Sequence, residues 1–222
     1  PLSMFAASAY RDDPCTRFKP HILDQNIYDV VDPGLVAKMH KAITVIQFKV
    51  EGQIIKRHPE YGLNHRCLLE HVDFDKGTVE VDGKTYPMLD MKFPTIDPKD
   101  PLKLTEQEAE LLQTLKMSFR HSGLLHKHIK FLYSHGSMYK CCNNNLLYHG
   151  CIPLKKDGSF DDIVFYGIPY SGKALMDFVD QMVQSAYFLP ESNPDKGVAS
   201  DFMWYLWCGA KSPLFGKEKM TT

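Results

Sequence analysis

Apolar side chains recur every three or four residues over the stretch with the most regular pattern in the chain. They are Leu35, Met39, Ile43, Ile46, Val50 and Ile54. This spacing places them on one face of a helix. Asp32 is a suitable N-cap and Pro33 suits the first helical position. The pattern therefore predicts a long helix from Pro33 to about Arg57, with an apolar face that needs a partner surface.

A second helical pattern begins at Thr105. The sequence Thr105-Glu106-Gln107-Glu108 is a capping box, in which a hydroxyl and a carboxylate satisfy free backbone N–H groups reciprocally. An apolar stripe follows and continues to Gly136, and Ser122-Gly123 is expected to break or bend the helix. Two more helices are predicted near the C-terminus. One covers residues 173–187, and the last carries Trp204 and Trp207 and is expected to be buried because it is apolar almost all round.

Short strands are predicted between these helices. Residues 78–88 alternate around Asp82-Gly83, which is a favoured type I′ hairpin signal. Two strands are expected around Asn143-Asn144-Asn145, the second of them over residues 145–150, and another strand or pair of strands over 161–170. The sequence therefore predicts an α+β fold in which several helices pack around one small mixed sheet.

Composition limits the class of protein. The chain has 222 residues, of which 44% are hydrophobic and 12% aromatic, so it can bury a core as one large domain or two small ones. Its formal net charge of −1 argues against binding to nucleic acid or to a membrane surface through electrostatics. No apolar run is long enough to span a bilayer. The six cysteines lack the spacing of a disulfide framework, so a cytoplasmic protein with reduced thiols is expected.

The two ends of the chain are unusual. It opens with Pro1-Leu2-Ser3-Met4, without an initiator methionine, and closes at Lys219-Met220-Thr221-Thr222 shortly after a glycine-containing turn. We therefore expect it to be an internal piece of a larger protein.

The main candidate for chemistry is His149, in the segment from Leu146 to Pro153. Residues of strand character lead into this histidine, and Gly150 follows, which would allow a sharp turn or the close approach of a ligand. A neutral imidazole at a strand end can bind a metal ion. The alternative is a histidine with a hydrogen-bonded structural role, and the residues alone leave both interpretations open.

Other chemistry is less well supported by the sequence. Cys141, Cys142, His149 and Cys151 lie close together, but adjacent cysteines on a strand point to opposite faces and cannot easily share a zinc ion. A Cys–His nucleophilic pair lacks an identifiable residue to orient the histidine. The helical histidines, His121, His126 and His128, together with His135, are expected to be solvated. Tyr170-Ser171-Gly172-Lys173 lacks the earlier glycine of a phosphate-binding loop.

Several long segments resemble one family. They are 39–43, 47–57, 93–101, Asn145-Leu146-Leu147-Tyr148-His149-Gly150-Cys151-Ile152-Pro153, 203–209, 212–217 and 219–222. On these residues the chain resembles the class III fructose-1,6-bisphosphatases of bacteria, which are calcineurin-like metallophosphoesterases. The resemblance covers essentially the whole chain.

The resemblance carries implications for the site. Such enzymes build a two-metal centre at strand ends from several motifs, and here only the strand-end His-Gly is matched, by His149-Gly150. The resemblance thus implies that His149 is a metal ligand and that the metal is Mn²⁺ or a similar divalent ion. Asn64-His65 does not match the family's G-N-H motif, and no catalytic or substrate-binding residue is carried over.

The resemblance also implies a function and an organisation. The parent enzyme would hydrolyse fructose 1,6-bisphosphate to fructose 6-phosphate and phosphate in gluconeogenesis, and this chain alone would be inactive. Residues 1–136 would form a mainly helical insertion, and 137–222 part of a β-sandwich core with two helices. Exposed strand edges would favour a homo-oligomer. The alternative is a non-catalytic module for packing, oligomerisation or regulation.

Overall fold

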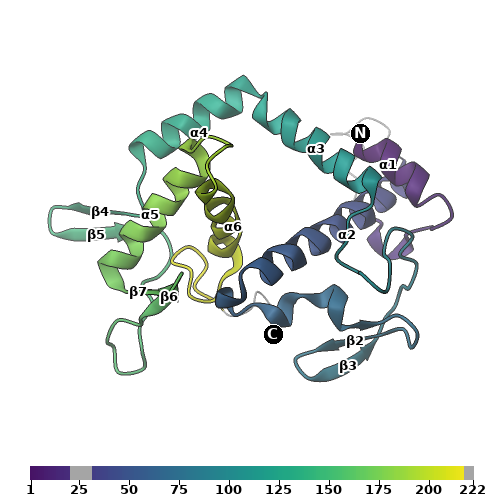
Figure 1. The fold of residues 1–222 in the computed structure, drawn as a ribbon, viewed down its shortest axis with the longest axis horizontal. Helices are drawn as coiled ribbons and strands as arrows, with labels where there is room; N and C mark the ends of the chain where they lie inside the picture. The colour runs from purple at the N-terminus through teal and green to yellow at the C-terminus, as the bar shows by residue number, and fades with distance from the viewer. Residues whose placement is uncertain (21–31, 218–222) are drawn as a thin grey trace. The chain divides into compact units, whose positions relative to one another are not determined.

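The computed structural model describes residues 1–20 and 32–217, and it is an α+β structure with about half of its residues in helices (Figure 1). The family-like segment 219–222 lies outside the described residues. The chain divides into two compact units. The first comprises Pro1–Arg57 and Leu63–Gly123, and the second comprises His58–Gly62 and the chain from Leu124 onwards.

The described residues of the first unit form the helices α1 (Leu2–Ala9), α2 (Pro33–Arg57) and α3 (Glu106–Arg120). The prediction of a long helix from Pro33 to Arg57 is confirmed. Its buried face differs from the predicted stripe, because Leu35, Met39, Ile43 and Val50 are only half-buried. The buried positions of α2 are Ala37, Lys41, Ala42, Val45, Ile46, Lys49, Gly52, Ile54 and Ile55.

The capping box at the start of α3 is also confirmed. The Glu108 backbone N–H donates to Thr105 Oγ1 at 3.2 Å, and the Thr105 N–H donates to Glu108 Oε2 at 2.8 Å. The first unit also contains the short 3₁₀ helices η1 (Thr16–Phe18), η3 (Asn64–Arg66) and η4 (Leu68–His71). One antiparallel sheet of this unit has the order β1 (Val72–Asp73), β2 (Thr78–Val81) and β3 (Lys84–Pro87). The hairpin predicted near 78–88 is therefore present, with Asp82 and Gly83 at φ 52° and 73°.

The second unit contains the 3₁₀ helix η2 (Pro59–Tyr61) and the helices α4 (Gly123–His135), α5 (Gly172–Phe188) and α6 (Asp195–Cys208). Its strands are β4 (Tyr139–Cys142), β5 (Asn145–Tyr148), β6 (Ile163–Phe165) and β7 (Ile168–Tyr170). The core is aromatic. The Phe165 ring meets the Phe202 ring edge-on at 5.0 Å between centroids and the Tyr205 ring at 5.1 Å, and it stacks on Phe178 at 5.6 Å.

The expectation of one small mixed sheet is wrong for the described residues. The strands form three separate sheets, β1–β2–β3, β4–β5 and β6–β7, and every pairing in them is antiparallel. Two-residue turns join β2 to β3, β4 to β5 and β6 to β7, and such turns produce antiparallel pairs, whereas parallel pairing needs a long crossover. The apolar last helix is also not fully buried, because the Trp207 side chain is 67% exposed.

Within the described residues, no helix is both long enough and apolar enough to cross a membrane.

Candidate functional site

His149 follows the last residue of β5. In the β4–β5 hairpin, Tyr139 is paired with Tyr148, so His149 lies just beyond the final pair of the ladder. Asn143 and Asn144 form the turn of this hairpin with φ of 50° and 60°, values that asparagine tolerates better than most residues. The His149 side chain is exposed. The hairpin therefore presents an imidazole at a strand end, as the sequence predicted.

Gly150 is in close contact with another part of the second unit. A Cβ atom built on Gly150 would collide with the carbonyl oxygen of Pro213 and would lie 3.1 Å from that of Leu214. The next residue, Cys151, donates its backbone N–H to the same Pro213 carbonyl oxygen at 2.9 Å. Only glycine fits at position 150 without a shift of one of these backbones.

Ser212 organises the loop that makes this contact. Its side chain is fully buried, and its hydroxyl donates to the Leu206 carbonyl oxygen in α6 at 2.6 Å. The same hydroxyl oxygen accepts the Leu214 N–H at 3.1 Å. The Ser212 carbonyl oxygen accepts the Gly216 N–H at 2.9 Å and the Cys151 thiol at 3.5 Å. The loop after α6 is thus tied both to α6 and to the segment that follows His149.

The cysteines near His149 do not complete a metal site. Cys141 and Cys142 are both exposed, and they pair across the hairpin with Leu146 and Asn145, so the strand sends them to opposite faces. Burial raises the pKa of the Cys151 thiol, which disfavours the thiolate that a metal would need. No group of three histidine, cysteine or acidic side chains in the described part of the chain could hold a metal ion. His149 has suitable donor chemistry, but these residues do not form a complete centre.

The helical histidines occupy exposed positions. His121, His126, His128 and His135 are all exposed, in agreement with the prediction. Two of them still make hydrogen bonds. His126 Nδ1 pairs with the Tyr187 hydroxyl, and His135 Nδ1 lies 3.0 Å from the Phe131 carbonyl oxygen. The latter contact lies within one helix, and neither arrangement is typical of metal ligation.

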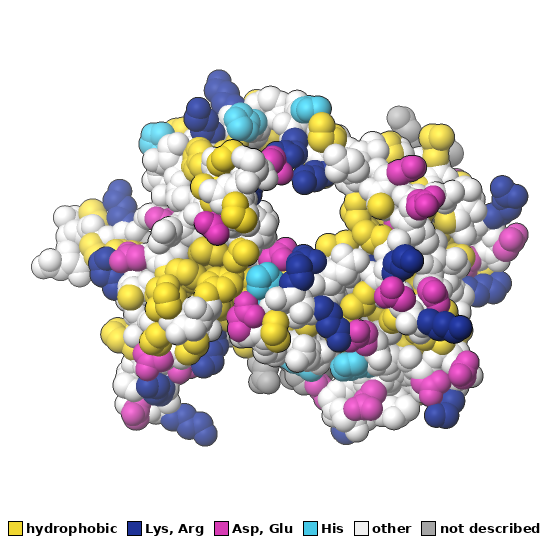
Figure 2. Space-filling model, viewed as in Figure 1, with side chains coloured by type: hydrophobic (Ala, Val, Ile, Leu, Met, Phe, Trp, Pro, Cys, Tyr) yellow, Lys and Arg dark blue, Asp and Glu magenta, His cyan; other side chains and the backbone are white. Residues whose placement is uncertain are grey.

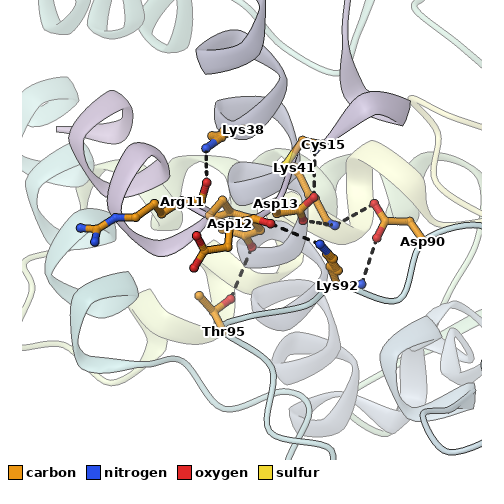
Figure 3. A network of polar contacts seen from close by, with 10 residues as sticks. Arg11, Asp12, Asp13, Cys15, Lys38, Lys41, Asp90, Lys92 and Thr95 are labelled. Atoms are coloured by element: carbon orange, nitrogen blue, oxygen red, sulfur yellow. Dashed lines mark hydrogen bonds and ion pairs between the residues drawn. The ribbon is translucent and has the colours of Figure 1, made fainter.

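A buried polar network in the first unit was not found from the sequence (Figure 3). The fully buried Lys41 donates to Asp13 Oδ2 at 2.6 Å and to Asp90 Oδ2 at 2.8 Å. Burial alone would favour the neutral acid at Asp13, but the hydrogen bond from Lys41 holds the pKa of this carboxyl below its usual value. The Lys41 ammonium also lies 5.2 Å from the centre of the Phe93 ring. Asp13 and Asp90 are too distant in sequence from Lys41 for a local pattern to reveal the pairing.

An open hollow of about 470 Å³ lies beside this network. Its lining includes Arg11, Asp12 and Lys92, and the Lys92 ammonium donates to the Asp12 carbonyl oxygen at 3.2 Å. The hollow thus carries charges of both signs, and the nearby ion pairs have a clear structural role in joining α2 to the loops around it.

His58 was also missed, because nothing in its local sequence distinguishes it. It is buried in the second unit, with Nδ1 at 2.8 Å from Glu60 Oε1 and Nε2 at 3.1 Å from Asp201 Oδ2. Its ring stacks on Tyr61 at 4.6 Å between centroids. The two carboxylates fix the ring orientation and attach the short His58–Gly62 segment to the second unit.

Charge is unevenly distributed along the part of the sequence that includes the hairpin with His149. No aspartate or glutamate occurs between Leu124 and Lys156, although this stretch includes Lys127, Lys130, Lys140, Lys155 and Lys156. Figure 2 shows basic side chains over α4, and it shows hydrophobic side chains gathered over the region of α5, β6 and β7. The chain's net charge of −1 conceals this local excess, which a segment-by-segment count would have found.

Comparisons with known proteins place the chain in a family. The family model described as Firmicute fructose-1,6-bisphosphatase matches residues 1–222. A protein from Clostridium tetani named "Fructose-1,6-bisphosphatase class 3" is 52% identical over 222 residues, which are all of this chain and 33% of the relative. Proteins of the same name from Finegoldia magna and Listeria monocytogenes are 49% and 48% identical, each with 34% of its length covered. No solved structure gives a significant match.

The chain thus spans about a third of the length of the curated relatives that it matches. The match extends through the His149 strand end and the loop that contacts it, and it agrees with the resemblance found in the sequence. This chain belongs to the Firmicute fructose-1,6-bisphosphatase family.

Proposed function

We propose that the chain is part of a metal-dependent phosphatase that hydrolyses fructose 1,6-bisphosphate to fructose 6-phosphate and phosphate, and that His149 is one of its metal ligands. The observation that carries the proposal is the position of His149, exposed at the end of β5 beside a glycine in close backbone contact. The names of relatives at 48–52% identity supply the substrate.

The proposal requires metal ligands in addition to His149. A bound pair of divalent ions would clamp the phosphate and activate water. The described residues contribute the imidazole of His149 and no group of three donors. We therefore propose that the other ligands come from parts of a family-length protein that these residues do not include, and that the ion is Mn²⁺, which imidazole and carboxylate ligands suit.

The exposure of β5 supports a place for it in a larger core. Leu146, Leu147 and Tyr148 are 47%, 56% and 45% exposed, although a strand with consecutive apolar residues is normally covered on both faces. We propose that β5 is a core strand of a metallophosphoesterase β-sandwich, with residues 1–136 acting as a mainly helical insertion. Additional strands would then cover the apolar side chains of β5.

The lysines around the hairpin suit an anionic substrate. Lys140 is exposed and is paired with Leu147 in the ladder, two residues before His149. Acidic side chains also lie nearby, because Asp177 accepts a hydrogen bond from Tyr139 and Asp162 pairs with Lys155. An exposed lysine close to His149 would attract an anionic ligand. We extend the proposal to a role in gluconeogenesis, a cytoplasmic location and self-association through the exposed apolar side chains.

The test is His149→Ala in a family-length protein that contains these residues, with His128→Ala as a matched control at an exposed position of α4. Mn²⁺-dependent phosphate release from fructose 1,6-bisphosphate should fall by more than about 100-fold for His149→Ala, because a metal ligand has been removed. The control should retain its activity.

The alternative is a non-catalytic module for packing, oligomerisation or regulation. The extensive exposed apolar surface of the second unit is compatible with such a role. A folded His149→Ala protein that keeps most of its turnover would favour this alternative and would remove the main support for the metal-ligand assignment.

A further inference from the structure

We propose that the loop from Gly209 to Gly216 is a positioning element for His149, and that it acts through its backbone contact with Gly150. The proposal rests on the proposed function, since it assigns a role to residues that hold a metal ligand in place. His149 remains the residue that would touch the metal, whereas Gly150 and Ser212 act through it.

The His149 ring has no hydrogen bond that would orient it among the described residues, and its side chain is exposed. Metal-bound histidines are usually oriented by a hydrogen bond to the second ring nitrogen. Here the direction of the side chain depends on the backbone at the end of β5. Whatever fixes that backbone therefore fixes the point and direction from which the imidazole extends, namely the Cα–Cβ bond.

Two contacts fix the backbone after β5. The Cys151 N–H donates to the Pro213 carbonyl oxygen at 2.9 Å, and Gly150 packs so closely on the same carbonyl that a side chain would not fit. A third contact joins the Cys151 thiol to the Ser212 carbonyl oxygen at 3.5 Å. The chain therefore leaves the strand in one direction, with His149 as the last residue before the contact.

The loop is itself held by a buried hydroxyl. Ser212 Oγ donates to the Leu206 carbonyl oxygen at 2.6 Å and accepts the Leu214 N–H at 3.1 Å, and the residue is fully buried. Leu206 belongs to α6 and is itself buried in the core of the second unit. A path of direct contacts thus leads from the core through Ser212 and Pro213 to Gly150, next to the proposed ligand.

The experiment measures Mn²⁺ binding to a family-length protein that contains these residues, by the electron paramagnetic resonance signal of free Mn²⁺. The variants are Gly150→Ala and Ser212→Ala, with Gly197→Ala as the control, because a Cβ at Gly197 meets nothing within 4 Å. Each variant is first checked for a cooperative thermal transition. Gly150→Ala and Ser212→Ala should each weaken Mn²⁺ binding by about 10–100-fold, the usual effect of losing a residue that orients a metal ligand. The control should bind as the parent does.

The outcomes separate this inference from the proposed function. If His149→Ala leaves Mn²⁺ binding unchanged, the proposed function fails and the positioning role fails with it. If His149→Ala abolishes binding while folded Gly150→Ala or Ser212→Ala protein binds Mn²⁺ with the parent affinity, only the positioning role is overturned. If Gly150→Ala does not fold, Mn²⁺ binding by Ser212→Ala alone decides whether the loop has the positioning role. That substitution removes a hydroxyl group and adds no atoms that could collide with the backbone.

Discussion

The ammonium of Lys49 donates to the carboxylate of Glu108 at 2.7 Å, and neither side chain is exposed to solvent. Lys49 lies on α2 and Glu108 is the capping-box glutamate of α3. The Lys49 ammonium also donates to the carbonyl oxygen of Thr95. One ion pair therefore joins two helices and the connecting segment between them within the first unit.

We predict that Lys49→Met lowers the free energy of unfolding by about 3–5 kcal/mol, because it leaves the Glu108 carboxylate buried without its charge partner. Chemical denaturation of the purified chain measures the loss. The double variant Lys49→Met/Glu108→Gln should lose less than the sum of the two single variants, because the uncompensated charge is gone.

The control for this prediction is Lys56→Met. Lys56 is 55% exposed and pairs with Glu70 at 2.6 Å near the end of the same helix. Because exposed ion pairs contribute little to stability, this variant should unfold almost as the parent does. Equal losses for Lys49→Met and Lys56→Met would show that burial of the pair does not determine its importance.

A second prediction concerns alkaline pH. Burial raises the pKa of Tyr10 to about 12, from an ordinary value of 10.0. The unfolded chain therefore ionises this phenol at a lower pH than the folded chain. The contribution of Tyr10 to stability is fully present below pH 10 and is lost as the pH rises to about 12, with a total on the order of 2–3 kcal/mol.

The measurement compares Tyr10→Phe with the parent in urea denaturation between pH 9 and pH 12. The variant cannot ionise at this position, so its stability should decline less steeply above pH 10. The Tyr10 hydroxyl lies 3.5 Å from Thr95 Oγ1, so the variant loses only a weak hydrogen bond. If the free energy of unfolding fell equally steeply with pH for the two proteins across this range, the prediction would be wrong.

Two glycines of the second unit should respond in opposite ways to alanine. Gly197 lies in α6, and a Cβ there would meet no atom within 4 Å, so Gly197→Ala should stabilise by about 0.5–1 kcal/mol through reduced backbone freedom. Gly209 caps the same helix, and a Cβ there would collide with the ring of Tyr205, which is 4% exposed. Gly209→Ala should therefore destabilise by about 1–3 kcal/mol.

Thermal or urea unfolding of the two alanine variants measures both effects in one comparison. The backbone of Gly209 has φ −72°, which alanine adopts without strain, so any loss there comes from the collision alone. Stabilisation by both substitutions would mean that the Tyr205 ring moves aside easily.

The sequence predicted the local structure better than the buried contacts. Periodicity and capping residues located α2 and α3 because those signals lie within a few residues of each other. The same periodicity misassigned the buried face of α2, because Lys41 and Lys49 count as polar and yet are fully buried. Their partners Asp90 and Glu108 lie 49 and 59 residues away, and no local pattern encodes such pairs.

The candidate site likewise has one feature that local sequence predicted and another that it did not. Residues of strand character and the following glycine indicated that His149 stands at a strand end, which the structure confirms. The support from Ser212 and Pro213 comes from about 60 residues further along the chain, so only the folded structure brings it to Gly150. The resemblance identified the family, but the role of His149 remains a prediction because the described residues contain no complete set of ligands.

The last prediction concerns the 222-residue chain itself. We predict that it releases no phosphate from fructose 1,6-bisphosphate in the presence of Mn²⁺, because one imidazole cannot hold two metal ions and the described residues offer no group of three donors. The measurement is a phosphate-release assay on purified, folded chain, with a family-length protein as the positive control. Mn²⁺-dependent release that His149→Ala abolishes would mean that the chain builds a working site alone. Release that survives His149→Ala would mean that the phosphate is hydrolysed at a different site, and the metal-ligand assignment would then have to be abandoned.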